Sequence, residues 1–380
     1  MERLFRPNYK NSIIGVPATL LDYVGVKNRY PKNKLIAEAL KGKYKNVIFM
    51  LFDGMGVSVL KKHLKEKDFL LANNKGIMHS VFPPTTTAAT TAYLTCKYPA
   101  EHGWLGWNMY FEELDKVVDL FTDKESFEQV SIGKGFVRSK LPIEYLDKKL
   151  EYRKKYEAHV VGPEYLSFQK KRFHGYTTDE EMYNNLKELC ASDKRKIIYC
   201  YNSNPDGIMH ECGASSEEAS QYIKKMNKDI EKLYKSVEDT LIIISADHGQ
   251  LDIENRIYLH QYKDICELLV TPPYIDSRAV SFRVKKGARV QFYNLFMKNF
   301  GHEFVLLTKE TVQKLKLFGK KSKYVNQYIG DFIAIGVGKS IIQYNPKGHD
   351  EDLFKFKGHH AGLTQDEVEV PLIILEKRSV

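Results

Sequence analysis

Four short groups of aspartate and histidine residues are the parts of this sequence best suited to chemistry. They are Asp53, Asp206 with His210, the pair Asp247 and His248, and the pair His359 and His360. Each group alone has an ordinary explanation, as a turn former, a helix cap, a surface i,i+4 pair or a solvated loop. Together they point to one cause, because carboxylate oxygen and imidazole nitrogen are ligands that suit zinc and also manganese. The sequence therefore predicts a metal site drawn from distant parts of the chain.

A threonine-rich run, Val81-Phe-Pro-Pro-Thr-Thr-Thr-Ala-Ala-Thr-Thr, supplies the candidate nucleophile. Such a run can simply begin a close-packed helix. It can also place a hydroxyl at a helix N-terminus, where free N–H groups stabilise anionic oxygen. A neutral hydroxyl is a poor nucleophile, and coordination to a metal would convert it to an alkoxide. The run is thus a candidate source of a threonine nucleophile.

Short apolar strands must position these residues. Strands are expected at residues 46–52, 76–82, 196–201, 241–245 and 370–375. Asp53, Asp206 and the Asp247–His248 pair each follow one of them. In an open parallel sheet ligands bind beyond the carboxyl ends of the strands, so one crevice could collect these three groups. The histidines at 359 and 360 would reach it from a loop before the last strand.

Helices are expected in the intervals between the strands. From residue 216 to 237 apolar residues recur on one helical face, and Ser215 with Glu218 resembles a capping box at the start of that helix. Alternation of strands and helices with near-continuous apolar strands predicts an α/β fold. Its central sheet would be mostly parallel, with helices on both faces.

Two stretches depart from this alternation. Residues 110–178 are charged and irregular, and we interpret them as a decoration of the catalytic domain. Residues 258–344 combine expected strands at 279–284 and 331–337 with a helical segment near 290–300, which indicates an inserted α+β cap domain. The catalytic domain would then comprise residues 1–257 and 345–380.

Size, charge and cysteine content narrow the class of protein. A chain of 380 residues with 43% hydrophobic residues can bury a large core. The net charge of +10 only slightly favours an anionic substrate, because the lysines are scattered and suggest no specific nucleic-acid partner. The five cysteines include no C-x-x-C pair, which argues against a disulfide framework or a thiolate zinc site. No signal peptide or membrane-spanning run is evident, so we expect a cytoplasmic protein, of open oligomeric state.

Six motifs, in order along the chain, resemble the nucleotide pyrophosphatase/phosphodiesterase (type I phosphodiesterase) branch of the alkaline phosphatase superfamily. They are Leu-Phe-Asp-Gly-Met-Gly, Phe-Pro-Pro-Thr-Thr-Thr-Ala, Tyr-Pro-Ala-Glu-His-Gly, Asp-x-x-x-His-x-x-Gly, Ala-Asp-His-Gly, and His-x-Gly-Leu followed by Val-Pro-Leu. The resemblance spans about residues 45–375. It implies an alkaline phosphatase-like fold and hydrolysis of a small anionic phosphoester. The histidine of the third motif, His102, matches no ligand position and is interpreted as structural.

The resemblance also implies two divalent metal ions, usually zinc, with manganese as the alternative. One ion would be held by Asp53, Asp247, His248 and the nucleophile, and the other by Asp206, His210 and a late histidine. The family places its nucleophile four residues after the phenylalanine of the second motif, which gives Thr86, with Thr85 and Thr87 as alternatives. The late ligand precedes a glycine-type turn, which favours His360 over His359.

The substrate-binding positions depart from the family pattern. The relatives place an asparagine after the His-Gly motif to bind a phosphate oxygen, and Asn108 is offset from that place by one position, where Trp107 stands. An aromatic residue that stacks on a base often follows the nucleophile in the relatives, but here that residue is Thr87. Trp107 is the candidate replacement, with Trp104 and Tyr110 as alternatives, although all three could belong to the core.

These residues predict a double displacement. The Thr86 alkoxide would attack phosphorus in line with the leaving oxygen, and water would then hydrolyse the phospho-threonine. A phosphomonoesterase, a phosphonate hydrolase, a mutase-like isomerase with a serine nucleophile, and a catalytically silent anion-binding module remain as alternatives. No arginine lies between residues 81 and 109, which favours a diester because the extra charge of a monoester calls for a positive group.

Overall fold

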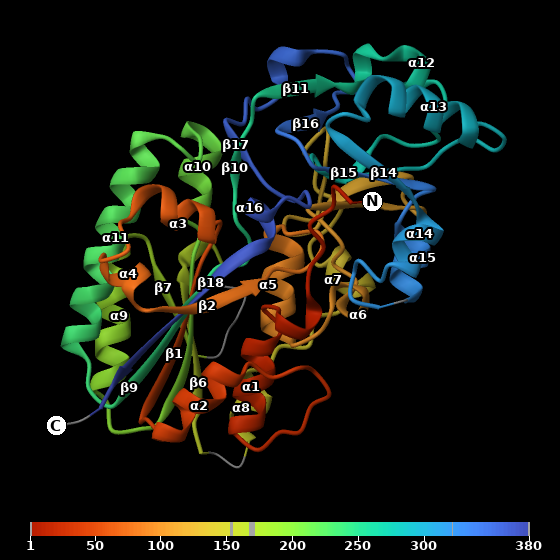
Figure 1. Cartoon of the computed structure of the whole chain (residues 1–380). Helices are drawn as coiled ribbons and strands as arrows, with labels where there is room; N and C mark the ends of the chain where they lie inside the picture. Colours follow the sequence, from red (N-terminus) through yellow and green to blue (C-terminus); the bar gives the residue numbers. More distant parts are fainter. Residues whose placement is uncertain (1, 153–154, 167–171, 321, 379–380) are drawn as a thin grey trace. The chain divides into compact units, whose positions relative to one another are not determined.

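The computed structural model describes residues 2–152, 155–166, 172–320 and 322–378, and the chain divides into two compact units. Unit 1 comprises Met1–Asn8, Ser80–Glu144 and Leu251–Val368, and unit 2 comprises Tyr9–His79, Tyr145–Gln250 and Glu369–Val380. Each unit is therefore assembled from three separate segments of the chain, which Figure 1 traces by colour. The expected separate cap at residues 258–344 stays a prediction.

Unit 2 is built on a seven-stranded sheet with the strand order β2-β18-β9-β1-β8-β6-β7. The strands are β1 (Asn46–Phe52), β2 (Asn74–His79), β6 (Glu157–Pro163), β7 (Phe173–Tyr176), β8 (Lys196–Asn202), β9 (Thr240–Ser245) and β18 (Glu369–Lys377). The five strands from β9 to β7 run parallel, while β18 is antiparallel to both β9 and β2. Every residue of β1 is buried, as expected for a strand covered on both faces. The predicted mostly parallel α/β sheet is confirmed.

Helices flank this sheet (Figure 1). They are α1 (Gly15–Tyr23), α2 (Lys34–Ala39), α3 (Val57–His63), α4 (Phe69–Ala72), α8 (Asp147–Leu150), α9 (Asp179–Ala191), α10 (Asp206–Cys212) and α11 (Glu217–Ser236). The long helix α11 packs against α3, α4 and α9, and its apolar face is buried as the sequence pattern predicts. Its predicted cap is wrong by one residue, because the hydroxyl of Ser216, not Ser215, accepts the backbone N–H of Ala219.

The expectation of irregular structure throughout residues 110–178 is wrong for β6 and β7, which extend the central sheet. Polar residues on these strands hide the apolar pattern. His159 and His174 lie side by side with ring nitrogens 3.0 Å apart, and Glu157 pairs with Lys194 and Arg172. These paired polar groups interrupt the apolar pattern of the two strands at the end of the sheet.

Unit 1 contains one four-stranded antiparallel sheet and three small sheets. The larger sheet has the order β12 (Tyr274–Asp276), β13 (Ala279–Phe282), β15 (Phe332–Gly336) and β14 (Phe304–Thr308). The small sheets are β3 (Asn108–Phe111) with β4 (Lys116–Asp119) and β5 (Lys124–Glu125), β10 (Leu251–Asp252) with β17 (Gly358–His359), and β11 (Asn255–Tyr258) with β16 (Ser340–Gln343). The predicted strands near 279–284 and 331–337 are thus confirmed.

Most helices of unit 1 contribute side chains to two apolar clusters. They are α5 (Thr86–Thr95), α6 (Pro99–His102), α7 (Phe136–Lys140), α12 (Lys263–Cys266), α13 (Arg289–Phe300), α14 (Lys309–Lys314), α15 (Lys323–Tyr328) and α16 (Gln365–Val368). Phe292, Phe296 and Phe300 of α13 pack in one cluster with Phe282 and Phe304 of the sheet. The other cluster centres on residues such as Trp104, Phe111 and Phe318. Among the described residues, no helix combines the length and apolar composition that crossing a membrane requires.

Candidate active site

The fold of unit 2 brings four predicted ligands to the carboxyl ends of three adjacent strands. Asp53 follows β1, Asp206 begins α10 after β8, and Asp247 and His248 follow β9. Asp53, Asp206 and His248 each offer one ligand atom, and these atoms lie within 4.8 Å of one another. The predicted gathering of these side chains in one place is therefore seen within this unit.

Backbone contacts tie the ligand-bearing turns together. The N–H of Asp53 donates to Asn202 O at 2.9 Å, and the N–H of Asp206 donates to Asp53 O at 3.0 Å. The N–H of Gly54 donates to Asp247 Oδ1 at 3.2 Å. Gly54 has a φ of 71°, and a Cβ there would lie only 3.0 Å from the Cβ of Asp206. A glycine is required at this point because the turns approach so closely.

The imidazole of His248 faces two carboxylates. Its Nδ1 lies 3.1 Å from the carbonyl oxygen of Gly249, which can only accept, so Nδ1 carries a proton. Its Nε2 lies 3.2 Å from Asp53 Oδ1 and 3.4 Å from Asp247 Oδ2. A backbone carbonyl that fixes the tautomer in this way is the usual arrangement around a metal-binding histidine. On α10, His210 Nε2 lies 3.2 Å from Asp206 Oδ2, one helical turn away.

The charges of this cluster suit a bound cation. Burial, and then the negative charge of Asp53, raises the pKa of Asp247 well above its usual range. Burial would lower the pKa of His248, but Asp247 and Asp53 outweigh it and raise that pKa to about 10. Both pKa shifts reflect an excess of negative charge at a buried site. Carboxylate and imidazole donors with this charge fit a divalent metal ion such as zinc or manganese.

In unit 1 the candidate nucleophile Thr86 is the first residue of α5 and is 9% exposed. The hydroxyls of its neighbours are engaged in structural hydrogen bonds. Thr85 donates to Asp276 Oδ2 at 2.9 Å, and Thr87 donates to the carbonyl oxygen of Gly106 at 2.6 Å. Thr85 and Thr87 are therefore engaged in hydrogen bonds within unit 1, and Thr86 stays the nucleophile predicted from the resemblance.

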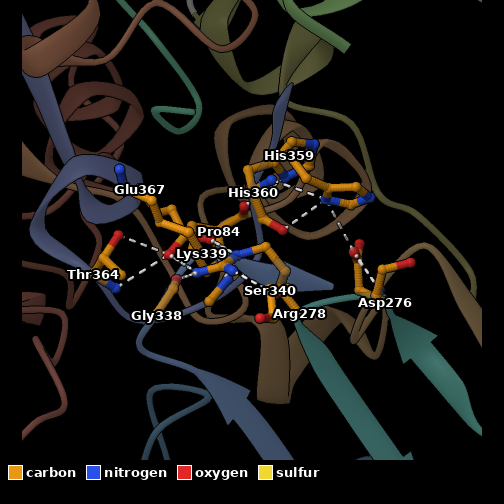
Figure 2. A network of polar contacts seen from close by, with 12 residues as sticks. Pro84, Asp276, Arg278, Gly338, Lys339, Ser340, His359, His360, Thr364 and Glu367 are labelled. Carbon is orange, nitrogen blue, oxygen red and sulfur yellow. Dashed lines mark hydrogen bonds and ion pairs between the residues drawn. The ribbon is translucent and has the colours of Figure 1, made fainter. Parts of the chain in front are cut away.

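The late histidines of unit 1 differ in what their rings can offer a metal (Figure 2). His360 Nδ1 donates to the carbonyl oxygen of Pro84 at 3.0 Å, so its Nε2 carries the lone pair. His359 Nδ1 lies 2.9 Å from both the backbone nitrogen and the carbonyl oxygen of His360, and its ring packs against Phe356. Each ring therefore has a backbone carbonyl beside its Nδ1, and the choice of His360 over His359 stays a prediction.

The predicted substrate-binding residues lie in and beside β3. Asn108 Oδ1 accepts the backbone N–H of Ile275 at 2.8 Å, which makes its Nδ2 the end that could donate to a phosphate oxygen. Trp107 is 42% exposed and meets Phe121 edge to face. Trp104 and Tyr110 are buried core residues. Of the three aromatic candidates, Trp107 is therefore the one available to a ligand.

Sequence reasoning missed two polar residues that contact the predicted ones. The hydroxyl of Tyr201, on β8, donates to Asp53 Oδ2. A buried tyrosine needs a hydrogen-bond partner, so its place at the end of a buried strand was an available signal. Asp276, the partner of Thr85, belongs to a strand almost 200 residues further on, and no local pattern points to it.

Comparisons with known proteins identify a family model and solved structures that this chain resembles. The family model for type I phosphodiesterase/nucleotide pyrophosphatase matches residues 47–361. Mouse ectonucleotide pyrophosphatase/phosphodiesterase 5, solved as an inactive threonine-to-alanine variant with AMP, has a TM-score of 0.64 and 16% identity, covering 86% of this chain and 87% of that one. The human protein of the same name has a TM-score of 0.64 and 18% identity over the same shares.

A second kind of solved structure is equally similar. Phosphonoacetate hydrolase from Sinorhizobium meliloti, in complex with phosphonoformate, has a TM-score of 0.65 and 16% identity, covering 87% of this chain and 89% of that one. At these identities the structures establish the alkaline phosphatase-like fold. A search of the curated proteins found no match to this chain.

Proposed function

Because this chain belongs to the type I phosphodiesterase/nucleotide pyrophosphatase family, we propose that it is a phosphodiesterase that acts through a phospho-threonine on Thr86. The family consists of phosphoric ester hydrolases, and the chain is an enzyme of that class. The observation that carries the proposal is the buried cluster of Asp53, Asp206, Asp247 and His248. A cluster of this charge and donor chemistry has no evident structural purpose, whereas phosphoryl transfer requires one.

The proposal assigns the predicted ligands to two divalent cations, with zinc preferred and manganese as the alternative. One would be held by Asp53, Asp247 and His248 with Thr86, and the other by Asp206, His210 and His360. The cations would supply electrostatic stabilisation of the attacking and leaving oxygens. Five of these ligands belong to unit 2, while Thr86 and His360 belong to unit 1. Their meeting at one site is part of the proposal.

The residues of unit 1 perform the remaining steps. The Oγ of Thr86 attacks phosphorus in line with the leaving oxygen, and the free N–H groups at the start of α5 stabilise the negative charge on the phosphoryl group. The Nδ2 of Asn108 donates to a non-bridging oxygen, and the exposed face of Trp107 packs against the leaving group. Water then hydrolyses the phospho-threonine. The inactive threonine-to-alanine variant of the mouse relative supports a threonine in this role.

Turnover of bis-p-nitrophenyl phosphate with added zinc or manganese tests the proposal. Thr86→Ala should remove turnover while the cations stay bound, and Thr86→Ser should keep part of it because it retains the hydroxyl. Thr87→Val is the matched control, since its hydroxyl bonds to a backbone carbonyl. Full activity of Thr86→Ala would reject the nucleophile, and a protein that binds no metal in stoichiometric amount would favour the silent anion-binding module.

A phosphonate hydrolase is the second candidate, favoured by the similarity to the phosphonoacetate hydrolase. The same enzyme preparation should be assayed for phosphate release from phosphonoacetate and for p-nitrophenol release from the diester and from p-nitrophenyl phosphate. The proposed function requires kcat/KM to be highest for the diester. A higher kcat/KM for phosphonoacetate would select the second candidate and leave the role of Thr86 intact.

A further inference from the structure

A fully buried ion pair lies beneath the loop that carries His360 (Figure 2). Arg278, between β12 and β13, donates from Nε to Glu367 Oε1 at 2.7 Å and from Nη2 to Glu367 Oε2 at 3.0 Å. Both side chains are 0% exposed. A buried ion pair is seldom more stabilising than apolar residues of the same volume, because removing two charges from water is costly. The presence of the Arg278–Glu367 ion pair therefore needs an explanation other than stability.

The ion pair is connected to the backbone on both sides. Glu367 Oε1 accepts the N–H of Gly362 at 2.7 Å, and Oε2 accepts the hydroxyl of Thr364 at 2.7 Å. Arg278 donates from Nη1 to the carbonyl oxygen of Ser340 at 2.7 Å and from Nη2 to that of Gly338 at 2.9 Å. The pair therefore joins the turn between β15 and β16 to the loop that follows His360.

The backbone of that loop is strained at the residue next to His360. Ala361 has a φ of 90°, a conformation that an alanine rarely adopts and that persists only where its surroundings enforce it. At Gly362 the loop packs so tightly that a Cβ would lie 2.6 Å from Gly336 O and 2.8 Å from Glu367 Oε2. The hydrogen bond from Gly362 to Glu367 holds the residue directly after the strained one.

The ring of His360 is held from the other direction by Pro84, whose carbonyl oxygen accepts its Nδ1 proton. The carbonyl oxygen of Pro84 and the backbone that follows His360 therefore both determine where Nε2 points. We propose that the Arg278–Glu367 ion pair is a positioning device that enforces the Ala361 conformation and so aims His360 Nε2 at its metal. This inference rests on the proposed role of His360 as a ligand.

The first test measures metal affinity rather than activity. Glu367→Gln keeps the size of the side chain and removes its charge. We expect the affinity of the cation site that uses His360 to fall about 10- to 100-fold, as is usual when the partner of a metal ligand is altered, while the other site stays within about twofold. Titration of zinc against a chelating indicator gives both constants, and circular dichroism reports whether the variant is folded.

Rescue separates positioning from a general structural role. Glycine adopts a φ of 90° without strain, so Ala361→Gly should need the ion pair less. In the Glu367→Gln background, Ala361→Gly is expected to restore at least part of the lost affinity, by about threefold or more, while alone it changes affinity less than about twofold. A carboxylate that merely stabilises the fold would show no such rescue.

Two further variants complete the design. Glu303→Gln is the matched control, because Glu303 holds the same turn through Lys339 N and Ser340 Oγ, and it should leave both affinities unchanged. If Glu367→Gln does not fold, Thr364→Val replaces it, since this substitution removes a single hydrogen bond to Glu367. We expect Thr364→Val to lower the affinity of the same site by about threefold.

The outcomes distinguish this inference from the proposed function. Loss of one cation site in His360→Ala, together with unchanged affinities in folded Glu367→Gln or Thr364→Val, would overturn the positioning role alone. Unchanged affinities in His360→Ala would instead overturn the ligand assignment on which the inference rests. Loss in both variants, with rescue by Ala361→Gly, supports the positioning role.

Discussion

His102 shows how a histidine within a family motif can serve the fold instead of the metal. It ends α6 in unit 1, is 3% exposed, and its Nδ1 accepts the backbone N–H of Trp104 at 3.1 Å. Burial lowers the pKa of His102 to about 3, and the carbonyl of Ala88 offsets this only in part. These contacts support the interpretation of His102 as a structural residue.

This histidine should make the protein sensitive to acid. Its folded pKa of about 3 lies below the unfolded value of about 6.5, so the folded state binds fewer protons between these two values. His102 should therefore not change the free energy of unfolding above about pH 6.5. Below that pH it should lower this free energy by roughly 1.4 kcal/mol for each pH unit. His102→Asn keeps an acceptor for Trp104 N and should flatten that part of the profile.

Urea unfolding at pH 7, 6 and 5 measures the effect as a difference between variants, which cancels the contribution of the carboxylates. The exposed His302 provides the matched control, because His302→Asn also removes one histidine but not a buried one. An identical slope in His102→Asn and the wild type would contradict the assignment of the acid sensitivity to this residue.

At the scale of elements, the start of α11 gives a direct comparison between two adjacent serines. The hydroxyl of Ser216 accepts the N–H of Ala219 at 3.1 Å, which satisfies one of the free donors of the first turn. Ser215 is exposed, and its hydroxyl accepts a hydrogen bond from the Nζ of the exposed Lys62 at 2.6 Å. Ser216→Ala should therefore lower the free energy of unfolding by about 1 kcal/mol.

Ser215→Ala should change the same quantity by less than about 0.5 kcal/mol, because surface substitutions away from a cap have small effects. Both values come from chemical denaturation at one pH. Equal effects of the two substitutions would show that the cap contact does not stabilise the helix.

Periodicity was a good guide to the interior of elements and a poor one to their ends. The continuous apolar runs of β1, β8 and β9 predicted three central strands. Because Asp53 and Asp247 directly follow two of these runs, they were expected at the carboxyl ends of strands. The cap of α11 was misplaced by one residue, since both serines fit a capping pattern and only the backbone geometry selects Ser216. β6 and β7 were missed because paired polar side chains interrupt their apolar pattern.

The contacts that orient the site were not predictable from the sequence. Arg278 and Glu367 are 89 residues apart, and nothing in either local sequence marks them as partners. The positive φ of Ala361 has no signal either, because glycine is the residue that usually announces such a conformation. Residue types identified the candidate ligands, whereas tertiary packing determined how they are aimed.

At the scale of the whole molecule, the candidate metal cluster lowers the stability of the metal-free protein. Unit 2 gathers Asp53, Asp206 and Asp247 at one edge of its sheet, where burial and mutual repulsion raise the pKa of Asp247. Without a cation this arrangement destabilises the folded state, as is common at functional sites. A metal that binds only the folded protein recovers that stability through its binding free energy.

Metal removal should therefore destabilise the wild-type protein. Asp247→Asn should raise the stability of the metal-free protein and reduce the stabilisation that zinc provides. Zinc at about 100 times its Kd should raise the free energy of unfolding of the wild type by about 2.7 kcal/mol relative to the protein in chelator. Asp247→Asn removes one buried charge and keeps an oxygen for the N–H groups of Gly54 and His248, so the metal-free variant should be more stable than the metal-free wild type by about 0.5–2 kcal/mol. Its gain in stability on adding zinc should shrink, because a ligand is lost.

Chemical denaturation in chelator and in zinc measures both changes, and substitution of the exposed Asp264 by Asn is the control. If the metal-free Asp247→Asn variant is less stable than the metal-free wild type, the carboxylate stabilises the fold by itself.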